Sequence, residues 1–484
     1  MTDLTDDPQT TLLPYVQNAR WFGGKGRPCR IASVRRLGVL TYTPTGTLPE
    51  DGPGVAIDLV EVAYDDGDDV DYYQLPLAFY GEPQEHLSHA LLGAWDDESF
   101  GKALVYDAVH DRAAMACWLD RFATTAPDAD ATDDEPLRFH RLPGHDLDTE
   151  VHSTLFSGEQ SNSSVAFGED SLMKVFRRVT PGRNPDITVH EVLTRAGSEH
   201  VAALYGWLEC DAVTGEGADR DDVLHLAMLQ QFLRTATDGW DLALNSVRNL
   251  FAEADLHADE VGGDFASESS RLGTALAEVH ATLRESFPTE DWRGERVSAL
   301  ADAMHRRLDD ALTAVPDLAP FEGPLRSTFD AVRTVSYASV QQVHGDLHLG
   351  QTLRTVKGWK IVDFEGEPAR RLADRTEPDS RWRDVAGMLR SFDYAPRVVA
   401  TTLDDDGDGE DVAAQREFRA TEWSSRNRSA FLDAYAPDGL DHEEGALLAA
   451  YLADKAVYEA VYEARNRPSW LHIPLTAIER IGTA

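Results

Sequence analysis

The spacing of hydrophobic positions changes along the chain and predicts where strands and helices lie. Two apolar runs, 55–63 and 70–80, flank the acidic cluster 65–69, a pattern typical of a β-hairpin. Apolar positions at helical spacing near 12–16 and over 106–122 predict a helix on either side of that hairpin. The first part of the chain is therefore predicted to be a small α+β unit.

Beyond this unit the pattern changes from short strands to long helices. Candidate strands lie at 164–167, 171–177 and 225–233, with a helix at 186–196 among them. After residue 240 the chain is mostly helical, interrupted by a strand-rich stretch at 337–364. The predicted helices of this part are 241–254, 268–286, 296–314, 381–394, 414–435 and 442–465. The order of elements predicts an α+β fold.

The charge balance excludes two classes of partner. The 484 residues include 85 acidic and 45 basic side chains, a formal net charge of −40. A chain this acidic is repelled by nucleic acids and by anionic membranes, so neither is expected as a partner. Its hydrophobic fraction of 42% is typical of folded proteins. Only six of the basic residues are lysines, and such an Asp-rich, Lys-poor surface is typical of proteins that work in high salt, where ions screen self-repulsion.

The chain is also expected to be cytoplasmic. Its three cysteines are widely spaced, which predicts neither a disulfide framework nor a CxxC metal pair. The N-terminus is acidic and lacks an apolar core, so no signal peptide is expected. No apolar run approaches the roughly 18 residues that a membrane span needs.

The segment HGDLHLGQ at 344–351, followed by WKIVDFE at 359–365, carries the most chemistry. A kinase-type site needs one carboxylate to orient the attacking hydroxyl and a second to hold magnesium against the nucleotide phosphates. The corresponding sequence patterns are H-x-D-x-x-x-x-N and D-F-G. In these patterns Asp346 fits the first carboxylate, the catalytic one, and Asp363 fits the second.

Gln351 and a hairpin complete the predicted metal site. Gln351 takes the place of the Asn in the pattern, and its amide oxygen is a suitable hard ligand for Mg²⁺. Segments 352–356 and 359–363 are predicted to form a hairpin that turns at Lys357 and Gly358. Such a hairpin folds the two carboxylates back toward each other.

A kinase-type site also needs a strand lysine that pairs with a helical glutamate. The run LMKVF at 172–176 places Lys174 inside an apolar strand, and Glu191 lies on the helix predicted next. In a chain so poor in lysine, a strand lysine suggests a position where a compact cation is needed for nucleotide phosphates. The alternative is an ordinary strand lysine whose ammonium points to solvent.

The other nucleotide contacts are predicted from their position along the chain. A phosphate-covering segment belongs just before the lysine strand, although the residues there lack G-x-G-x-x-G. This predicted segment is Ser161, Asn162, Ser163 and Ser164. The strand 226–233 is expected to touch adenine through backbone groups near Gln230 and Phe232.

Two departures from the protein-kinase patterns indicate which class of acceptor the site takes. Gly345 replaces the arginine of H-R-D, and Glu365 replaces the glycine of D-F-G. Protein kinases use that arginine to hold a phosphorylated activation loop, and no Ser- or Thr-rich segment follows Asp363. The expected acceptor is therefore the hydroxyl of a small molecule.

These motifs resemble the aminoglycoside-phosphotransferase-like kinase superfamily, and within it the bacterial maltokinases. The resemblance covers nearly the whole chain, and its last three motifs are much more specific than the general kinase signature. The motifs are NARWFGGKGR at 18–27, KVFRR at 174–178, DGWDLAL at 238–244, HGDLHLGQ at 344–351, VDFEGEP at 362–368, RDVAGMLRSFDY at 383–394 and DKAVYEAVYEARNRPSWLHIP at 454–474.

The resemblance implies a bilobal, protein-kinase-like α+β fold with an N-terminal cap subdomain. The expected parts are the cap at 1–100, an intermediate subdomain with the nucleotide-binding strands at 101–234, and a mainly helical C-lobe at 235–484. It also implies ATP-dependent phosphorylation of maltose at its anomeric hydroxyl, which gives maltose 1-phosphate for α-glucan (glycogen) synthesis. A trehalose synthase is a candidate protein partner.

The last long helix is predicted to form part of a sugar site. Residues at spacings i, i+4, i+7 and i+11 share one face of a helix. Here that face carries Tyr451, Lys455, Tyr458 and Tyr462. Aromatic rings can stack on a pyranose, while Lys455 and Glu459 can bind its hydroxyls. The alternative for the tyrosines is core packing, but a lysine within a packed stripe is costly unless it is paired.

Three further candidates each have two open roles. Asp384 and Arg390 lie on a helix with an apolar face and are expected either to support the site or to contact the sugar. That apolar face is Val385, Met388, Leu389 and Phe392. His348 is expected to hydrogen-bond either the sugar or the catalytic loop.

Two segments imitate other kinds of site. WFGGKGR at 21–27 lacks the first glycine and the hydroxyl of the phosphate loop G-x-x-x-x-G-K-[ST], so a structural turn is predicted. Asp404, Asp406 and Asp408 imitate the start of a calcium loop, but Gln415 stands where a bidentate Glu is needed. A solvated acidic loop is therefore predicted there.

Two rival functions stay open. One is a kinase of the same fold that phosphorylates another sugar, such as glucosamine. The other is a catalytically inactive kinase fold that serves as a binding module, for instance for a trehalose-converting enzyme. The inactive module is less favoured because the chain has all four residues expected of an active kinase site, namely Lys174, Glu191, Asp346 and Asp363.

Overall fold

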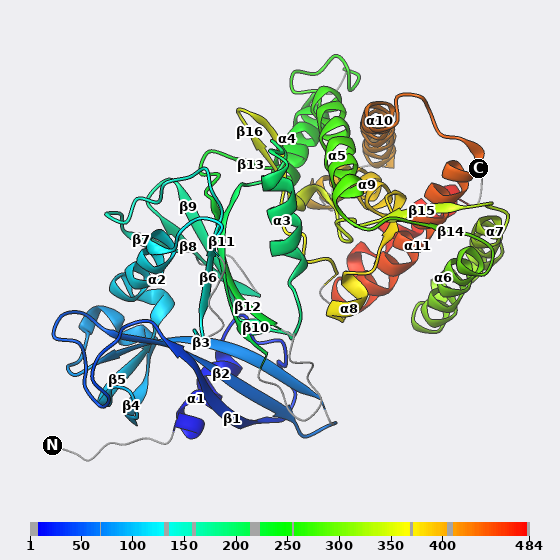
Figure 1. The fold of residues 1–484 in the computed structure, drawn as a ribbon. Helices are drawn as coiled ribbons and strands as arrows, with labels where there is room; N and C mark the ends of the chain where they lie inside the picture. Colours follow the sequence, from blue (N-terminus) through cyan, green and yellow to red (C-terminus); the bar gives the residue numbers. More distant parts are fainter. Residues whose placement is uncertain are drawn as a thin grey trace. The chain divides into compact units, whose positions relative to one another are not determined.

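The chain forms two compact units in a computed structural model (Figure 1). Unit 1 consists of Met1–Thr188 and Ala203–Arg234, and unit 2 of Val189–Ala202 and Thr235–Ala484. The predicted three-part division stays a prediction. The structure describes residues 8–67, 69–129, 135–156, 161–212, 223–253, 256–367, 371–403 and 410–481.

The first sheet of unit 1 is antiparallel and contains the predicted hairpin. Its strands run in the order β1 (Cys29–Val39), β2 (Gly54–Tyr64), β3 (Val70–Tyr80), β5 (Gly101–Asp107) and β4 (Leu91–Asp97), with β10 (Arg178–Val179) also paired to β3. The hairpin of β2 and β3 is confirmed, with Val60 opposite Tyr73. Helix α1 (Pro8–Asn18), also predicted, contacts β1 and β4.

The helix predicted over 106–122 begins later than expected. Residues Arg112–Thr124 form α2, whose N-cap is Asp111, whereas Tyr106 belongs to β5. In β5 the buried Ala103 and Val105 lie on either side of the less buried Leu104, which is the period of a strand. The capping carboxylate of Asp111, which accepts from the Ala113 N–H at 3.0 Å, marks the true start of the helix.

The second sheet of unit 1 contains the strands predicted for nucleotide binding. Its order is β6 (Arg138–Arg141), β11 (Leu204–Asp211), β12 (Val223–Gln231), β9 (Ser171–Phe176), β8 (Asn162–Phe167) and β7 (Ser153–Leu155). The predicted strands β8, β9 and β12 are confirmed. Gln74 of β3 joins the two sheets, because its buried side-chain amide donates to the carbonyl of Phe176 at 2.7 Å and to that of Leu226.

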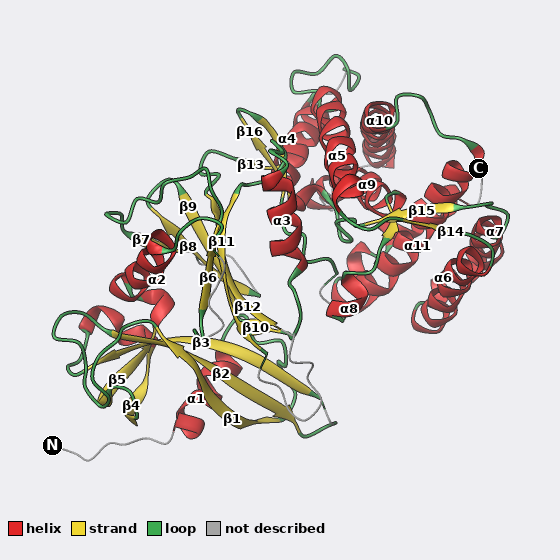
Figure 2. Ribbon diagram, viewed as in Figure 1, coloured by secondary structure: helices red, strands yellow, loops and turns green. Residues whose placement is uncertain are grey.

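Unit 2 is mainly helical, as predicted (Figure 2). Its helices are α4 (Gly239–Ala252), α5 (Ala266–Ser286), α6 (Glu295–Ala314), α7 (Glu322–Val332), α8 (Leu372–Arg375), α9 (Trp382–Leu403), α10 (Glu410–Tyr435), α11 (His442–Asn466) and α12 (His472–Ile481). Helix α3 (Pro185–Arg195) spans the boundary between the two units. Short 3₁₀ helices lie at Glu85–Ala90, Ala108–His110, Pro316–Phe321, Leu349–Gln351 and Pro468–Trp470.

Two small sheets stand among these helices. One has the order β13 (Thr237–Asp238), β16 (Thr352–Thr355) and β17 (Gly358–Ile361), and the other β14 (Glu290–Trp292), β15 (Ala338–Gln341) and β18 (Asp379–Ser380). The predicted hairpin is confirmed, because β16 pairs antiparallel with β17 and Thr355 lies opposite Gly358. Gly358 has φ of 129°, a backbone conformation in the region that glycine tolerates best.

Helix α9 forms the centre of the core of unit 2. Its predicted apolar face is buried, and α4, α10 and α11 pack against it. Because α9 is surrounded by other helices, polar side chains such as Asp384 and Arg390 are buried along with the apolar ones. These polar groups need partners inside the protein.

No described helix combines the length and apolar character that a membrane crossing requires. All three cysteines are free thiols.

Candidate active site

The predicted catalytic loop follows β15 and leads through a 3₁₀ turn into the β16–β17 hairpin. Asp346 lies on this loop, and Asp363 lies just after β17. The hairpin brings Gln351 next to Asp363, with Gln351 Nε2 donating to Asp363 Oδ2 at 3.1 Å. Asp363 has φ of 67°, a left-handed conformation that is uncommon outside glycine and is concentrated at functional sites.

His344 connects the two halves of this arrangement. Its Nδ1 accepts from the Asp346 N–H at 3.3 Å, and its Nε2 lies 3.0 Å from the carbonyl oxygen of Val362. These partners place the ring proton on Nε2, which donates to Val362. The ring also packs on Phe364, with centroids 4.9 Å apart. One buried imidazole therefore fixes the backbone at Asp346 relative to the backbone beside Asp363.

Asp384 of α9 holds the start of the same loop. Its Oδ2 accepts from the His344 N–H at 2.7 Å and its Oδ1 from the Gly345 N–H at 2.8 Å. His280 Nε2 is 3.0 Å from Oδ2, and its Nδ1 contacts the Tyr435 hydroxyl at 2.8 Å. Burial raises the pKa of Asp384, but its bonds to His280 and the loop hold that pKa below the usual range. Of its two predicted roles, the contacts favour support of the loop over sugar contact.

Two residues of α9 that the sequence analysis did not identify also hold the loop. A side chain on Gly387 would put Cβ 2.4 Å from the Leu347 carbonyl oxygen, so the helix and the loop can approach only at a glycine. Ser391 Oγ accepts from the Leu349 N–H at 3.0 Å. Asp384, Gly387 and Ser391 follow one another at i, i+3 and i+7, which is the spacing of one helix face. That spacing was the available signal.

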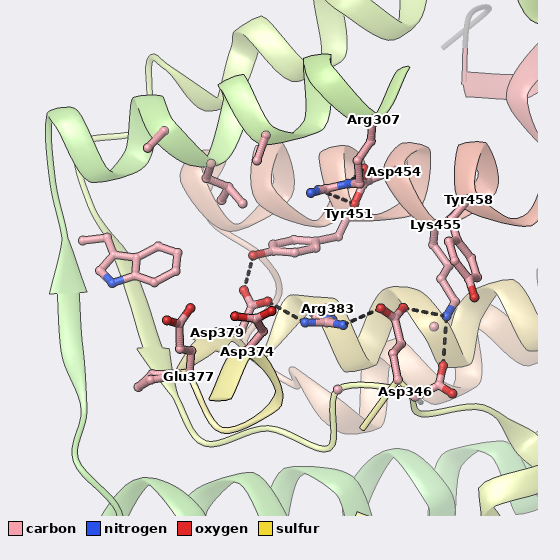
Figure 3. Close-up of a pocket in the computed structure, with 18 of the residues that line it drawn as sticks. Arg307, Asp346, Asp374, Glu377, Asp379, Arg383, Tyr451, Asp454, Lys455 and Tyr458 are labelled. Carbon is pink, nitrogen blue, oxygen red and sulfur yellow. Dashed lines mark hydrogen bonds and ion pairs between the residues drawn. The ribbon is translucent and has the colours of Figure 1, made fainter. Parts of the chain in front are cut away.

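A cavity of about 580 Å³ opens beside Asp346, entirely within unit 2 (Figure 3). Lys455 and Tyr458 of α11 line it, as predicted for the sugar site, together with Trp292 of β14. A volume of this size suits a small-molecule ligand. The cavity therefore places Asp346 on the wall of a site that can hold a sugar.

Lys455 forms an ion pair with Asp346. Its Nζ lies 3.1 Å from Asp346 Oδ1 and 3.6 Å from Glu367 Oε1. The ammonium also lies 5.1 Å from the centre of the Tyr458 ring. Burial lowers the pKa of Lys455, but Asp346 and Glu367 outweigh it and raise the pKa above its usual value. Lys455 thus stays a cation beside Asp346.

Further ion pairs form the rest of the cavity wall. Arg383 bridges Glu367 at 3.3 Å and Asp379 at 3.0 Å. Figure 3 shows its guanidinium next to Asp379. Arg307 of α6 forms a bidentate pair with Asp454 of α11, with distances of 2.8 and 2.7 Å.

Carboxylates outnumber cations around the cavity. The carboxylates are Glu290, Asp346, Glu367, Asp374, Glu377, Asp379 and Asp454, and the cations are Arg296, Arg307, Arg383 and Lys455. The lining therefore carries an excess of three negative charges when all of these groups are ionised. Such a lining attracts a cationic ligand more than a neutral one.

Three predicted sugar contacts are placed away from the cavity. Arg390 is 2% exposed and donates to Glu459 Oε2 through two nitrogens, at 2.9 and 2.6 Å, so each is the other's partner in the core. Of the two predicted roles of Arg390, this pairing favours support over sugar contact, because a buried charge needs its partner. The predicted sugar contact of Glu459 stays a prediction. Tyr462 is 45% exposed, lies against Arg467 and does not line this cavity.

His348 contacts the catalytic loop, which was one of its two predicted roles. Its Nδ1 accepts from the Gly350 N–H at 3.1 Å and so caps the 3₁₀ turn that carries Gln351. Burial lowers its pKa, which keeps the ring neutral and Nδ1 available as an acceptor. This contact favours a structural role.

In unit 1, Lys174 of β9 pairs with a different carboxylate from the one predicted. Its Nζ lies 2.9 Å from Asp186 Oδ2 at the start of α3. Glu191, the predicted partner, is on the next turns of α3 and accepts from Arg195 at 2.9 Å. A carboxylate on the helix was expected and is found, but it is Asp186 and not Glu191. The sequence alone does not show which turn of the helix faces the strand.

The predicted phosphate-covering segment divides between two faces of a strand. Ser161 precedes β8, and the other three residues begin it. Ser164 lies opposite Lys174, whereas Ser163 accepts from Arg177 Nε at 2.8 Å. Because neighbouring side chains of a strand point to opposite faces, Ser163 and Lys174 cannot serve one site in this conformation. The prediction for Ser163 is therefore corrected, and those for Ser161, Asn162 and Ser164 stay predictions.

The predicted adenine contacts are also partly corrected. The Gln231 N–H donates to the Ala203 carbonyl and the Phe232 N–H to the Asp170 carbonyl, each at 2.8 Å. Gln230 pairs with strands on both sides within the sheet. The N–H of Phe232 is thus already used inside unit 1, and the role of Gln230 stays a prediction.

The glycine-rich segment 21–27 is a structural turn, as predicted. Gly26 has φ of 81°, and a side chain on Gly24 would collide with the ring of Tyr64. Arg27 closes the turn with a bond of 3.0 Å to Asp66. The calcium-like run 404–409 lies outside the described residues.

Comparison with known proteins agrees with this fold. Residues 15–111 match the family model of the maltokinase N-terminal cap domain. A glucosamine kinase of Streptacidiphilus jiangxiensis is 29% identical over 329 residues, which are 65% of this chain and 70% of that protein. A glucosamine kinase of Mycolicibacterium smegmatis is 26% identical over 336 residues, 66% of this chain and 77% of that protein.

One solved structure matches along almost the full length. It is a glucosamine kinase in complex with glucosamine, ADP and inorganic phosphate, with a TM-score of 0.66, 22% identity and 99% of both chains covered. The predicted resemblance to maltokinase-like kinases is confirmed, as is the α+β, bilobal, kinase-like fold with an N-terminal cap domain.

Proposed function

We propose that this protein is an ATP-dependent sugar kinase in which Asp346 orients the acceptor hydroxyl and accepts its proton. The chain is a phosphotransferase with an alcohol group as acceptor, the class to which both curated relatives belong. The observation that carries the proposal is the position of Asp346, held by His344 and lining the 580 Å³ cavity. A positioned carboxylate of this kind contributes to phosphoryl transfer mainly through orientation.

The loop contacts explain how Asp346 is held for this task. Asp384 fixes the backbone N–H groups before it, and Ser391 fixes one after it. Lys455 forms an ion pair of 3.1 Å with Asp346 and lies where it can also hold a neighbouring sugar hydroxyl. The hydroxyl proton passes to Asp346 while the acceptor oxygen bonds to the γ-phosphorus of ATP, and the bond between that phosphorus and the bridging oxygen breaks, so that ADP leaves.

Asp363 and Gln351 are the proposed holders of Mg²⁺. Their carboxylate and amide oxygens are the hard ligands that this ion prefers, so the residues present fit it. Gln351 Nε2 donates to Asp363 here, and rotation of the amide by half a turn offers its oxygen instead. When bound, Mg²⁺ neutralises charge on the nucleotide phosphates. ATP is proposed as donor because a neighbour of the same fold was solved with ADP.

Lys174 is the proposed phosphate-binding cation of unit 1. Its ammonium on β9 is held by Asp186 of α3, and Ser164 of the neighbouring strand β8 lies opposite it on the same face of the sheet. A lysine fixed in this way offers a compact charge to a nucleotide phosphate.

For the acceptor, we favour an amino sugar such as glucosamine over maltose. The excess of three carboxylates around the cavity suits a protonated amine, which maltose lacks. Both curated relatives are glucosamine kinases. Maltose is the second candidate, and the match of residues 15–111 to the maltokinase cap domain supports it. A partner such as trehalose synthase belongs with the maltose alternative.

The acceptor is tested by a kinase assay with ATP and Mg²⁺ over glucosamine, maltose, glucose and trehalose. The expected result is ADP release with glucosamine at a kcat/KM at least tenfold above that of glucose, since the two differ only in the amine. Higher turnover with maltose would replace the amino-sugar assignment by the maltose one. No turnover with any of the four would favour the inactive binding module.

A further inference from the structure

A second cavity, of about 650 Å³, lies entirely within unit 1. It is lined by α1 and the segment after it, by β4 and β5, and by β7 and β8. We propose that it is a binding site for a phosphomonoester carried on a small ring, of which a sugar phosphate is the prime example. This site goes beyond the proposed function, because it is separate from the residues assigned to phosphoryl transfer.

Arg177 is the residue that identifies the cavity as a ligand site. Its side chain is 1% exposed, and two of its three nitrogens are used inside the protein. Nη2 donates to both carboxylate oxygens of Asp107, at 3.0 and 2.7 Å, and Nε donates to Ser163 Oγ. Nη1 has no hydrogen-bond partner among the described residues. A buried guanidinium nitrogen without an acceptor is costly, and an anionic oxygen in the cavity would satisfy it.

The cavity lies on the face of β8 and β9 away from Lys174. Ser163 lies opposite Val175 in the register of the two strands, and Arg177 follows two residues later. Ser164 and Lys174 lie opposite each other and so point to the other face. A ligand on Arg177 therefore does not occupy the position proposed for the nucleotide phosphates.

The charges around this cavity differ in sign from those of the acceptor cavity. Its lining has two cations, Arg20 and Arg177, and one carboxylate, Asp107. Asp107 already accepts from Arg177 and from the Tyr15 hydroxyl, so its charge is compensated. Burial lowers the pKa of His110, which leaves that ring neutral. In a chain of net charge −40, a cavity with a net positive lining favours an anion.

The rest of the lining suits a ring. Tyr15, Trp21 and Phe156 contribute aromatic surface, and Ser163 contributes a hydroxyl. Aromatic surface next to hydrogen-bonding side chains is the usual lining of sites for small cyclic ligands. A phosphate on Arg177 with its ring against these side chains would use both features.

Isothermal titration of the full chain with glucose 6-phosphate tests the site, with glucose as the neutral control and inorganic phosphate as the control without a ring. Glucose 6-phosphate is expected to bind, glucose to give no heat and phosphate to bind at least tenfold more weakly. Ala19→Phe fills the cavity next to α1, and it should weaken binding of glucose 6-phosphate at least tenfold while leaving kinase turnover unchanged.

Ala113→Phe on the exposed side of α2 is the matched control and should bind as the wild type does. Arg177→Lys keeps the charge but removes Nη1, and it should also weaken binding at least tenfold. Equal binding by wild type and Ala19→Phe, or no binding by the wild type, would overturn the proposal. Binding of inorganic phosphate as tight as that of glucose 6-phosphate would reject the ring component. These readouts do not depend on catalysis, so they are separate from a failure of the proposed kinase activity.

Discussion

Asp384 is a buried carboxylate on α9 that holds the loop carrying Asp346, although it is not part of that loop. Both of its oxygens accept backbone N–H groups of the loop, and His280 approaches one of them. The cluster lies next to Asp346 but away from solvent, with Asp384 1% exposed. Such a residue is a positioning residue, and its loss should appear in kcat and in stability together.

Asp384→Asn tests this role at a single atom. The amide replaces one acceptor oxygen by a donor that faces a backbone N–H, so a buried hydrogen bond is lost. We expect a loss of about 1–3 kcal/mol in the free energy of unfolding. Displacement of Asp346 should lower kcat by about 10- to 100-fold. Urea unfolding and steady-state kinetics measure the two effects.

The exposed Asp433→Asn on α10 is the control for Asp384→Asn and should change neither quantity. A wild-type kcat in Asp384→Asn together with reduced stability would contradict the positioning role. Such a result would leave Asp384 as part of the core only.

At the scale of elements, the relation of α9 to the catalytic loop decides the geometry of the site. The helix approaches the loop so closely that Gly387 has no room for a side chain. Asp384 and Ser391 bond to the loop on either side of that contact. About two turns of the helix therefore support the loop. A small change in the distance between the helix and the loop should alter activity.

Gly387→Ala tests this close approach. A methyl group there would lie 2.4 Å from the Leu347 carbonyl oxygen, so the helix or the loop must move. We expect a destabilisation of about 1–3 kcal/mol and a lower kcat. Gly445→Ala in α11 is the matched control, because it has open space around it and alanine favours a helix. Equal stability of Gly387→Ala and the wild type would show that the contact can relax at no cost.

Elements with regular patterns could be predicted from the sequence, and contacts between distant segments could not. The hairpin of β16 and β17 was predicted because apolar strands flank a Lys-Gly turn. Strand β11 was missed although its partner β12 is the next strand along the chain, and its other partner, β6, lies far earlier. The start of α2 was misplaced because apolar residues of β5 run directly into it, and only the cap at Asp111 separates them.

The candidate site shows the same division. Asp346, Asp363 and Gln351 follow a short pattern, and the hairpin brings the last two together. The predicted partner of Lys174, Glu191, lies more than one turn after the partner in the structure, Asp186, on α3. A period of 3.6 residues shows which residues share a face of a helix, but it does not show which turn faces the strand. Glu459 was assigned to sugar, and Arg390 to support or sugar contact, whereas the fold pairs the two with each other.

At the scale of the whole molecule, the charge of −40 is the dominant property. Arginines such as Arg27 and Arg307 form ion pairs with aspartates, but the 85 acidic side chains far outnumber the 45 basic ones. Self-repulsion of this excess opposes the compact state, and mobile ions reduce it. The two cavities differ in local charge. The lining of the acceptor cavity is net negative, whereas the lining of the cavity around Arg177 is net positive.

Salt is therefore expected to stabilise the protein. Raising KCl from about 0.1 M to about 1 M shortens the screening length from about 10 Å to about 3 Å. We expect the thermal midpoint to rise by several degrees over this range, measured by differential scanning calorimetry. Sucrose at matched osmolality serves as the control for effects that do not depend on charge. A midpoint that falls or stays constant with KCl would contradict a high-salt adaptation.

The catalytic assignment of Asp346 is tested most directly by the turnover of Asp346→Asn. ADP release from ATP and Mg²⁺ is measured with the acceptor that the wild type uses best, alongside urea unfolding of both proteins. We predict that kcat falls by about 10²- to 10⁴-fold while the unfolding midpoint stays close to that of the wild type, because Asn keeps the shape of the side chain but cannot accept the proton. Turnover within a few-fold of the wild type in a folded Asp346→Asn would contradict the account.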